Sequence, residues 1–210
     1  MSVMQKAQNI KNIIFDMGNV LIRFEPDWFI GRYNLTADEK RVLLNEIYRS
    51  PEWIMLDRGT LDESGMEMRV LPRIPESLHK IACELIEQWD NPLLPVEGSI
   101  ELVKQLKSNG YRLYLFSNAC ARQHVYWKKA EVSSLFDGKL ISADVKMLKP
   151  EAEIYHVLFK KFSLNPAECL FIDDTVPNIE AGMREGMDGI VFNKDMEELK
   201  RKLVLHGVNI

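Results

Sequence analysis

The sequence predicts an α/β protein, in which helices cover both faces of a parallel sheet and an all-helical segment is inserted after the first strand. Two observations lead to this prediction. Short apolar runs that end in polar residues alternate with segments whose apolar residues recur at helical spacing, as in strand–helix–strand units. One long stretch, residues 24–95, interrupts this alternation with helical patterns alone.

The first strand is predicted over residues 12–16, an apolar run that ends at Asp16 and is followed by Gly18. Continuous apolar runs of this kind suit strands that are buried on both faces. The other predicted strands are residues 111–116, 169–172 and 189–192, with a weaker candidate at 139–143. A polar residue follows each of these strands, just as Asp16 ends the first strand.

Helical patterns lie between these strands. Residues 100–106 carry apolar positions on one helical face, and Gly110 is a typical helix stop. Further helices are predicted after Pro150, before Gly186 and after Asp195, which forms a capping-box pattern with Glu198. Such helices connect parallel strands through right-handed crossovers, so the pattern favours one parallel sheet.

Residues 24–95 are predicted to form a helical cap, inserted into a core made of residues 1–23 and 96–210. Thr36 and Glu39 fit a helix-start capping box, and apolar residues from Leu78 to Trp89 follow a second helical pattern. Prolines flank the segment, as expected at stiff hinges between substructures.

Composition and charge exclude several classes of function. The chain has 27 basic and 31 acidic residues, a formal net charge of −4, and so offers no broad basic surface for nucleic acid. No apolar run approaches the roughly 20 residues of a membrane span, and residues 1–11 lack the apolar segment of a targeting signal. The three cysteines are too widely spaced for a zinc cluster. We expect a cytoplasmic monomer or homodimer.

Polar side chains gather where the predicted strands end. The carboxyl ends of parallel strands meet at one crevice, so we expect Asp16, Ser117, Asn118, Asp173 and Asp174 to lie close together. Three crowded carboxylates repel one another unless a cation lies among them, and hard oxygen ligands suit Mg²⁺. The sequence therefore predicts a magnesium site at this edge of the sheet.

The same residues suit chemistry at phosphorus. Ser117 and Asn118 supply short hydrogen-bond donors for phosphoryl oxygens, and Lys149, just before Pro150, supplies a positive charge. A carboxylate can attack phosphorus to give an aspartyl-phosphate, which divides one hard hydrolysis into two easier displacements. We assign this nucleophilic role to Asp16.

Four ordered motifs resemble those of the haloacid dehalogenase-like hydrolases, and the resemblance covers nearly the whole chain. The motifs are residues 15–21, 116–118, 149–151 and 171–174. The resemblance implies a Rossmann-like core with a helical cap and an Mg²⁺-dependent phosphatase that acts on a small phosphorylated metabolite. It also implies a metal held by Asp16, the Gly18 carbonyl, Asp173 and Asp174. The first motif is similar to that of bacterial sugar-phosphate phosphatases of the glucose-1-phosphate type.

Gly18 departs from the family pattern. Most family phosphatases have a second Asp two residues after the nucleophile, where it protonates the leaving group and later activates water. General acid–base help of this kind is typically worth about 100- to 10,000-fold in rate. Two other hypotheses therefore stay open: a haloacid dehalogenase, in which Asp16 attacks carbon without a metal, and a catalytically weak protein that binds a phosphorylated metabolite. The paired Asp173 and Asp174 argue against the dehalogenase.

The cap offers candidates for substrate specificity. Trp53 and residues 57–59 precede a predicted helix start, and from them we take Trp53 and Arg58 as the candidates. The other aromatic residues of the cap are expected to form its core. Lys146 is a rival to Lys149, but the Lys149-Pro150 pair matches the family motif better.

Overall fold

The computed structural model describes residues 9–210 and contains one five-stranded parallel sheet in the order β3-β2-β1-β4-β5. The strands are β1 (Asn12–Phe15), β2 (Arg112–Ser117), β3 (Gly138–Ile141), β4 (Cys169–Asp173) and β5 (Asp188–Val191). The expected α/β class is confirmed. The expectation that residues 1–11 carry no targeting signal concerns mainly residues 1–8, which lie outside the described part.

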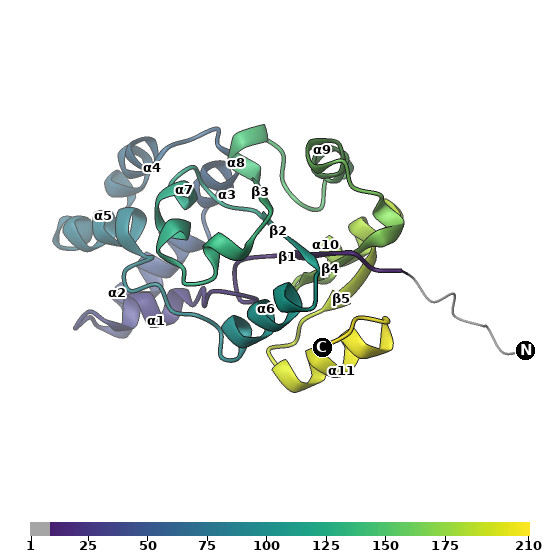
Figure 1. Cartoon of the computed structure of the whole chain (residues 1–210). Coiled ribbons are helices and arrows are strands. Elements are labelled where there is room, and N and C mark those ends of the chain that lie inside the picture. Colours follow the sequence, from purple (N-terminus) through teal and green to yellow (C-terminus); the bar gives the residue numbers. More distant parts are fainter. Residues whose placement is uncertain (1–8) are drawn as a thin grey trace, which may run out of the picture.

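Helices cover both faces of this sheet (Figure 1). One face packs against α6 (Ser99–Ser108) and α11 (Met196–Leu205), and the other against α9 (Ala152–Phe162) and α10 (Val176–Arg184). Successive strand residues alternate between the two cores: Ile13 faces the first and Ile14 the second, and both are fully buried. Burial on both faces explains why the strands are apolar throughout.

The regular elements between β1 and α6 are all helical, apart from isolated β-bridges of Ile22 with Gly18 and Pro95. It contains α1 (Pro26–Gly31), α2 (Ala37–Leu43), α3 (Pro51–Arg58), α4 (Glu63–Val70) and α5 (His79–Gln88), with a π-helical turn at Leu44–Tyr48 and 3-10 turns at Leu71–Arg73 and Glu76–Leu78. Thr36 and Glu39 form the complete capping box that the sequence predicts. Helices α1, α2, α4 and α5 lie at the left of the molecule in Figure 1, away from α9 and α11, and α3 lies nearer to the sheet, beside α8.

Short helical elements complete the core. They are α7 (Gln123–Tyr126) and α8 (Ser142–Val145), with 3-10 turns at Trp127–Lys129, Ser133–Leu135 and Pro166–Glu168. The α8 helix follows β3 directly and packs against α3, so it joins the sheet to the helical insertion. This contact positions α3 relative to the carboxyl ends of the strands.

Aromatic side chains pack where the helical insertion meets the core. The ring of Phe24 lies 5.6 Å from Trp53, 5.1 Å from Trp89 and 5.8 Å from Phe29, measured between ring centroids. Pairs at such distances stabilise a fold beyond the area that they bury. Phe24, in the segment between β1 and α1, thus packs against α1, α3 and the end of α5.

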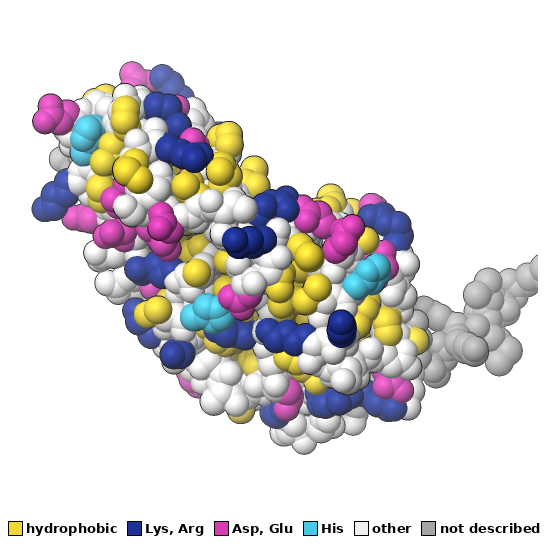
Figure 2. Space-filling model, turned by 90° about the horizontal axis from the view of Figure 1, so that it is seen from above, with side chains coloured by type: hydrophobic (Ala, Val, Ile, Leu, Met, Phe, Trp, Pro, Cys, Tyr) yellow, Lys and Arg dark blue, Asp and Glu magenta, His cyan; other side chains and the backbone are white. Residues whose placement is uncertain are grey.

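The surface shows no field of a single charge in the view of Figure 2, where basic and acidic side chains are interspersed. This distribution agrees with the small net charge of −4. Among the helices of residues 9–210, none combines the length and the apolar character that a membrane span requires.

Candidate active site

The edge at which β1 and β4 end brings three carboxylates together. Phe15 of β1 pairs with Ile172 of β4, so Asp16, which follows β1, and Asp173, the last residue of β4, lie at the same level of the sheet. The strand order reverses at this pair of strands, which is where open α/β sheets form their ligand crevices. Oxygen atoms of Asp16, Asp173 and Asp174 all lie within 4.8 Å of one another.

Lys149 lies between two of these carboxylates. Its ammonium group donates hydrogen bonds to Asp16 Oδ1 at 2.9 Å, to Asp173 Oδ2 at 2.6 Å and to the Phe116 carbonyl at 2.9 Å. The residue is only 4% exposed, and its nitrogen also lies 5.1 Å from the centre of the Phe171 ring. A buried ammonium needs such partners to offset the loss of hydration. Lys149, rather than the exposed Lys146, therefore occupies the site.

Asn118 fixes the backbone of Lys149. The Lys149 N–H donates to Asn118 Oδ1 at 2.8 Å, and Asn118 Nδ2 donates back to the Lys149 carbonyl at 2.9 Å. The adjacent Ser117 is buried at the end of β2, and both residues line the pocket described below. The structure thus brings Ser117 and Asn118 to the carboxylate cluster, as expected, with Asn118 engaged in positioning Lys149.

Two asparagines that the sequence interpretation did not single out orient the carboxylates. Asn178, in the first turn of α10, donates to both oxygens of Asp173 at 3.0 and 3.1 Å. Asn19 donates to Asp174 Oδ2 at 3.3 Å from a backbone with φ 54°, a conformation that asparagine tolerates well. Asn19 belongs to the first motif, whereas no local signal in the sequence connects Asn178 to Asp173.

Burial changes the proton affinities in this cluster. It raises the pKa of Asp16 to about 7, an effect that Lys149 opposes and the other two aspartates reinforce. Burial also raises the pKa of Asp174, with help from the Asp173 carboxylate. Burial alone would lower the pKa of Lys149, but the carboxylates of Asp16 and Asp173 outweigh it and raise that pKa. Lys149 therefore stays charged.

The donor set fits a hard divalent cation. One buried ammonium group pairs with two of the three carboxylates, so the cluster carries more acidic groups than cationic partners. Each aspartate offers an oxygen within 4.8 Å of the others. Mg²⁺ prefers oxygen ligands of this kind. Gly18 lines the same pocket as Asp16 and Asp174.

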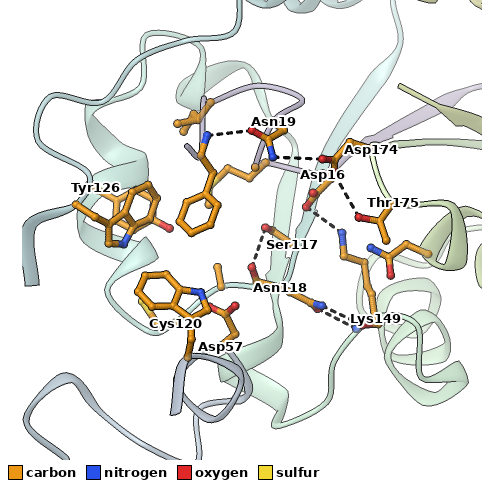
Figure 3. Close-up of a pocket in the computed structure, with 18 residues that line it drawn as sticks. Asp16, Asn19, Asp57, Ser117, Asn118, Cys120, Tyr126, Lys149, Asp174 and Thr175 are labelled. Carbon is orange, nitrogen blue, oxygen red and sulfur yellow. Dashed lines mark hydrogen bonds and ion pairs between the residues drawn. The ribbon is translucent and has the colours of Figure 1, made fainter. Parts of the chain in front are cut away.

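A pocket of about 240 Å³ opens over the cluster (Figure 3). Its core side contains Asp16, Gly18, Ser117, Asn118, Lys149 and Asp174 among others. The insertion and the segment leading to it contribute Phe24, Trp53, Asp57 and Trp89. A ligand in this pocket would therefore contact charged groups on one side and aromatic rings on the other.

The two specificity candidates lie in different places. Trp53 lines the pocket, whereas Arg58 forms an ion pair with Glu151, with Nη1 3.1 Å from Oε2. Asp57, which was not taken as a candidate, lines the pocket instead. Residues four apart share a helical face, so Trp53 and Asp57 point the same way on α3 and Arg58 does not. This four-residue spacing is the signal in the sequence by which Asp57, which was missed, could have been found.

Gly18 leaves space beside the cluster. A Cβ atom added to it would have its closest contact with Phe24 Cβ, at 3.8 Å, which is an ordinary van der Waals distance. Close packing therefore does not require a glycine at position 18.

The family model of the haloacid dehalogenase-like hydrolases matches residues 10–186 of this chain. The chain belongs to this hydrolase family, as its four motifs predict. A sesquiterpene phosphatase of Aspergillus oryzae is 29% identical over 187 residues, which are 86% of this chain and 88% of the relative. A D-ribitol-5-phosphate phosphatase of Bacteroides thetaiotaomicron is 23% identical, over 85% of this chain and 90% of its own length.

A solved structure has the same fold. The magnesium complex of a haloacid dehalogenase family enzyme from Bacteroides thetaiotaomicron superimposes with a TM-score of 0.70 and 22% identity. The match covers 92% of this chain and 99% of that chain. The Rossmann-like arrangement is thereby confirmed.

Proposed function

We propose that this protein is an Mg²⁺-dependent phosphatase that removes phosphate from a small phosphorylated metabolite, a sugar phosphate, through an aspartyl-phosphate on Asp16. The observation that carries the proposal is the cluster of Asp16, Asp173 and Asp174 at the floor of one pocket, with Lys149 bonded to Asp16 and Asp173. The phosphatase names of the two curated relatives and the magnesium complex of the solved structure support it.

Lys149 prepares Asp16 for attack. It holds Asp16 through Oδ1 alone, so we assign the attack on phosphorus to Oδ2. The ammonium group, which is almost completely buried, also offsets negative charge that develops on the phosphoryl oxygens. Ser117 supplies a hydroxyl donor at the end of β2, and Asn118 holds Lys149 in place.

Asp16, the Gly18 carbonyl, Asp173 and Asp174 would hold the metal. When bound, Mg²⁺ neutralises phosphate charge and polarises the phosphorus–oxygen bonds. Asn178 and Asn19 keep Asp173 and Asp174 turned toward the cluster. The grouping favours phosphatase over dehalogenase chemistry, because attack on carbon needs no set of metal ligands.

We propose that residues 24–95 act as a cap that selects the substrate. Trp53, Trp89 and Phe24 cover the pocket from the cap side, and its volume of about 240 Å³ suits a small molecule. Aromatic rings can pack against the apolar faces of a sugar. Arg58 contributes through its ion pair with Glu151, which ties α3 to the core.

The test is phosphate release from a panel of phosphate monoesters by the purified protein with Mg²⁺. The panel includes hexose and pentitol phosphates and a prenyl phosphate, and Asp16→Asn is compared with Asp27→Asn, an exposed aspartate of α1. We expect turnover that Asp16→Asn abolishes and Asp27→Asn retains. A folded protein that releases no phosphate from any substrate contradicts the proposal. Halide release from a haloacid in EDTA would identify a dehalogenase instead.

A further inference from the structure

The active site lacks a proton donor at the position where the family pattern places one, because Gly18 has no side chain. Among the described residues, three carboxylates line the pocket: Asp16, Asp174 and Asp57. The first two belong to the proposed metal site. The third comes from α3 in the cap, and it has no role in the function proposed so far.

We infer that Asp57 is the general acid and base of the reaction, supplied by the cap in place of a carboxylate at position 18. The inference rests on the proposed phosphatase function. Figure 3 shows the side chains of Asp57 and Asp16 at the same pocket, with Asp57 carried by the cap and Asp16 by the core.

Three successive residues anchor this part of α3 to the core. The Asp57 carbonyl accepts a hydrogen bond from the Ser142 hydroxyl of α8, and Arg58 forms its ion pair with Glu151. Gly59, with φ 73°, approaches Ala143 so closely that an added Cβ would lie 2.5 Å from the Ala143 oxygen. These contacts hold Asp57 against the core, as positioning of a catalytic group requires.

The surroundings of Asp57 keep its carboxyl group protonated near neutral pH. Burial raises the pKa of Asp57 to about 8, and the Asp16 carboxylate adds to this effect. The backbone N–H of Cys120 and the indole N–H of Trp53 lower it in part. The other titratable groups that act on it are Cys120 and Tyr126, and burial raises the pKa of both, so both are neutral. Asp57 is therefore available as an acid at pH 7.

The proton balance of the two displacements is complete. In the first, Asp16 Oδ2 bonds to phosphorus, the bond from phosphorus to the substrate oxygen breaks, and the Asp57 carboxylic acid donates its proton to that oxygen. In the second, water attacks the phosphorus, the Asp57 carboxylate takes a proton from the water, and the bond to Asp16 breaks. Both carboxyl groups return to their starting states.

The experiment compares leaving groups. For wild type and Asp57→Asn, kcat/KM is measured with a sugar phosphate and with p-nitrophenyl phosphate, whose leaving group needs no proton. Since kcat/KM reports the phosphorylation step, we expect Asp57→Asn to lower it about 100- to 10,000-fold for the sugar phosphate and less than about tenfold for the aryl ester. Asp38→Asn, an exposed aspartate of α2 in the cap, is the matched control and should change neither value.

A second variant tests the same inference by rescue. Position 18 has space for a side chain. Adding Gly18→Asp to Asp57→Asn should therefore raise kcat/KM for the sugar phosphate at least tenfold above that of Asp57→Asn alone. Asp57→Asn should also accumulate phosphoenzyme with the aryl ester, because the second step lacks its base. Circular dichroism verifies that each variant is folded.

The outcomes separate the two proposals. Equal losses for both leaving groups, or no loss, would overturn the role of Asp57 while the wild-type enzyme still released phosphate. If Asp57→Asn does not fold, Gly18→Asp in the otherwise wild-type protein provides the test. An activity at least 100-fold above that of wild type would show that wild type has no general acid, and would overturn the role of Asp57. A wild-type protein that turns over no phosphate ester refutes the proposed function itself.

Discussion

Lys149 is the residue on which the charge balance of the active site depends. It is almost completely buried and bonds to both Asp16 and Asp173, while Asn118 holds its backbone from the neighbouring strand end. Removing one partner of a buried ion pair leaves the other charges without compensation, which costs more than the pair itself contributes. The residue thus serves stability and chemistry together.

Replacing Lys149 by Gln should therefore destabilise the fold as well as abolish turnover. We expect a loss of about 3–5 kcal/mol in the free energy of unfolding, measured by urea denaturation at pH 7.5. Lys146→Gln, a change at an exposed lysine three residues earlier, should stay within about 0.5 kcal/mol of wild type. Equal stability of the two variants would show that Lys149 is not the essential counter-charge.

Asp57 should make stability depend on pH in a direction opposite to that of an ordinary aspartate. Its pKa is about 8 in the folded protein and about 3.9 in an unfolded chain, so only the folded state holds the proton between these values. The contribution of Asp57 to the free energy of unfolding is thus complete below pH 4 and is lost as the pH rises toward 8.

Asp57→Asn removes this loss because the amide does not titrate. Relative to wild type, the free energy of unfolding of the variant should rise by about 1–3 kcal/mol between pH 5 and pH 8. This value is smaller than the full 1.4 kcal/mol per pKa unit because the Asp57 side chain is partly exposed. Urea denaturation in EDTA at both pH values measures the difference. A difference in the free energy of unfolding that stays constant across this range would contradict the raised pKa of Asp57. The control Asp38→Asn should show the same pH dependence as wild type.

At the scale of elements, the contact between α3 and α8 links the cap to the sheet. The α8 helix directly follows β3, and α3 ends against it at Gly59, whose positive φ turns the chain away toward α4. Helix α3 also carries Trp53 and Asp57 on the face that lines the pocket. The placement of two pocket residues therefore depends on one close backbone approach.

Gly59→Ala should displace α3, whereas Gly110→Ala provides a matched control. Both glycines have positive φ, so each substitution costs about 1 kcal/mol in backbone strain. An added Cβ at Gly110 meets nothing within 4 Å, while at Gly59 it would overlap the Ala143 backbone. We expect Gly59→Ala alone to raise KM and lower kcat, in addition to a larger loss of melting temperature. Similar kinetics for both variants would show that the α3–α8 approach does not position the pocket.

At the scale of the whole molecule, a chain with net charge −4 concentrates three carboxylates at one point of its sheet. This concentration costs folding energy through repulsion, and a bound cation would relieve it. Binding to the folded state alone raises stability by mass action. The apparent stability of the protein should therefore depend on magnesium.

Mg²⁺ at 100 times its dissociation constant should add about 2.7 kcal/mol, which corresponds to roughly 5–10 °C in melting temperature for a chain of this length. Thermal unfolding in EDTA and in MgCl₂ measures the shift, with NaCl at equal ionic strength as the control for screening. Asp174→Asn should reduce the shift. A rise that is identical in NaCl, or that Asp174→Asn leaves unchanged, would exclude a specific site at the three aspartates.

The sequence by itself determined the strands, their order along the chain and the polar residues at their ends. Apolar runs fix which segments are buried, and a parallel sheet brings their carboxyl ends to one edge, so Asp16, Ser117, Asn118 and the Asp173-Asp174 pair were predictable together. Lys149 was identified through its motif. These features depend on local periodicity and on the general geometry of parallel sheets.

Only the tertiary structure decided which side chains complete the site from elsewhere. Asn178 reaches Asp173 because α10 begins immediately beyond β4, and Asp57 reaches the pocket because α3 packs on α8. Arg58 and Asp57 are neighbours in sequence, yet one bonds to Glu151 and the other lines the pocket. Their directions depend on the rotation of α3 about its axis, and contacts with distant residues set that rotation.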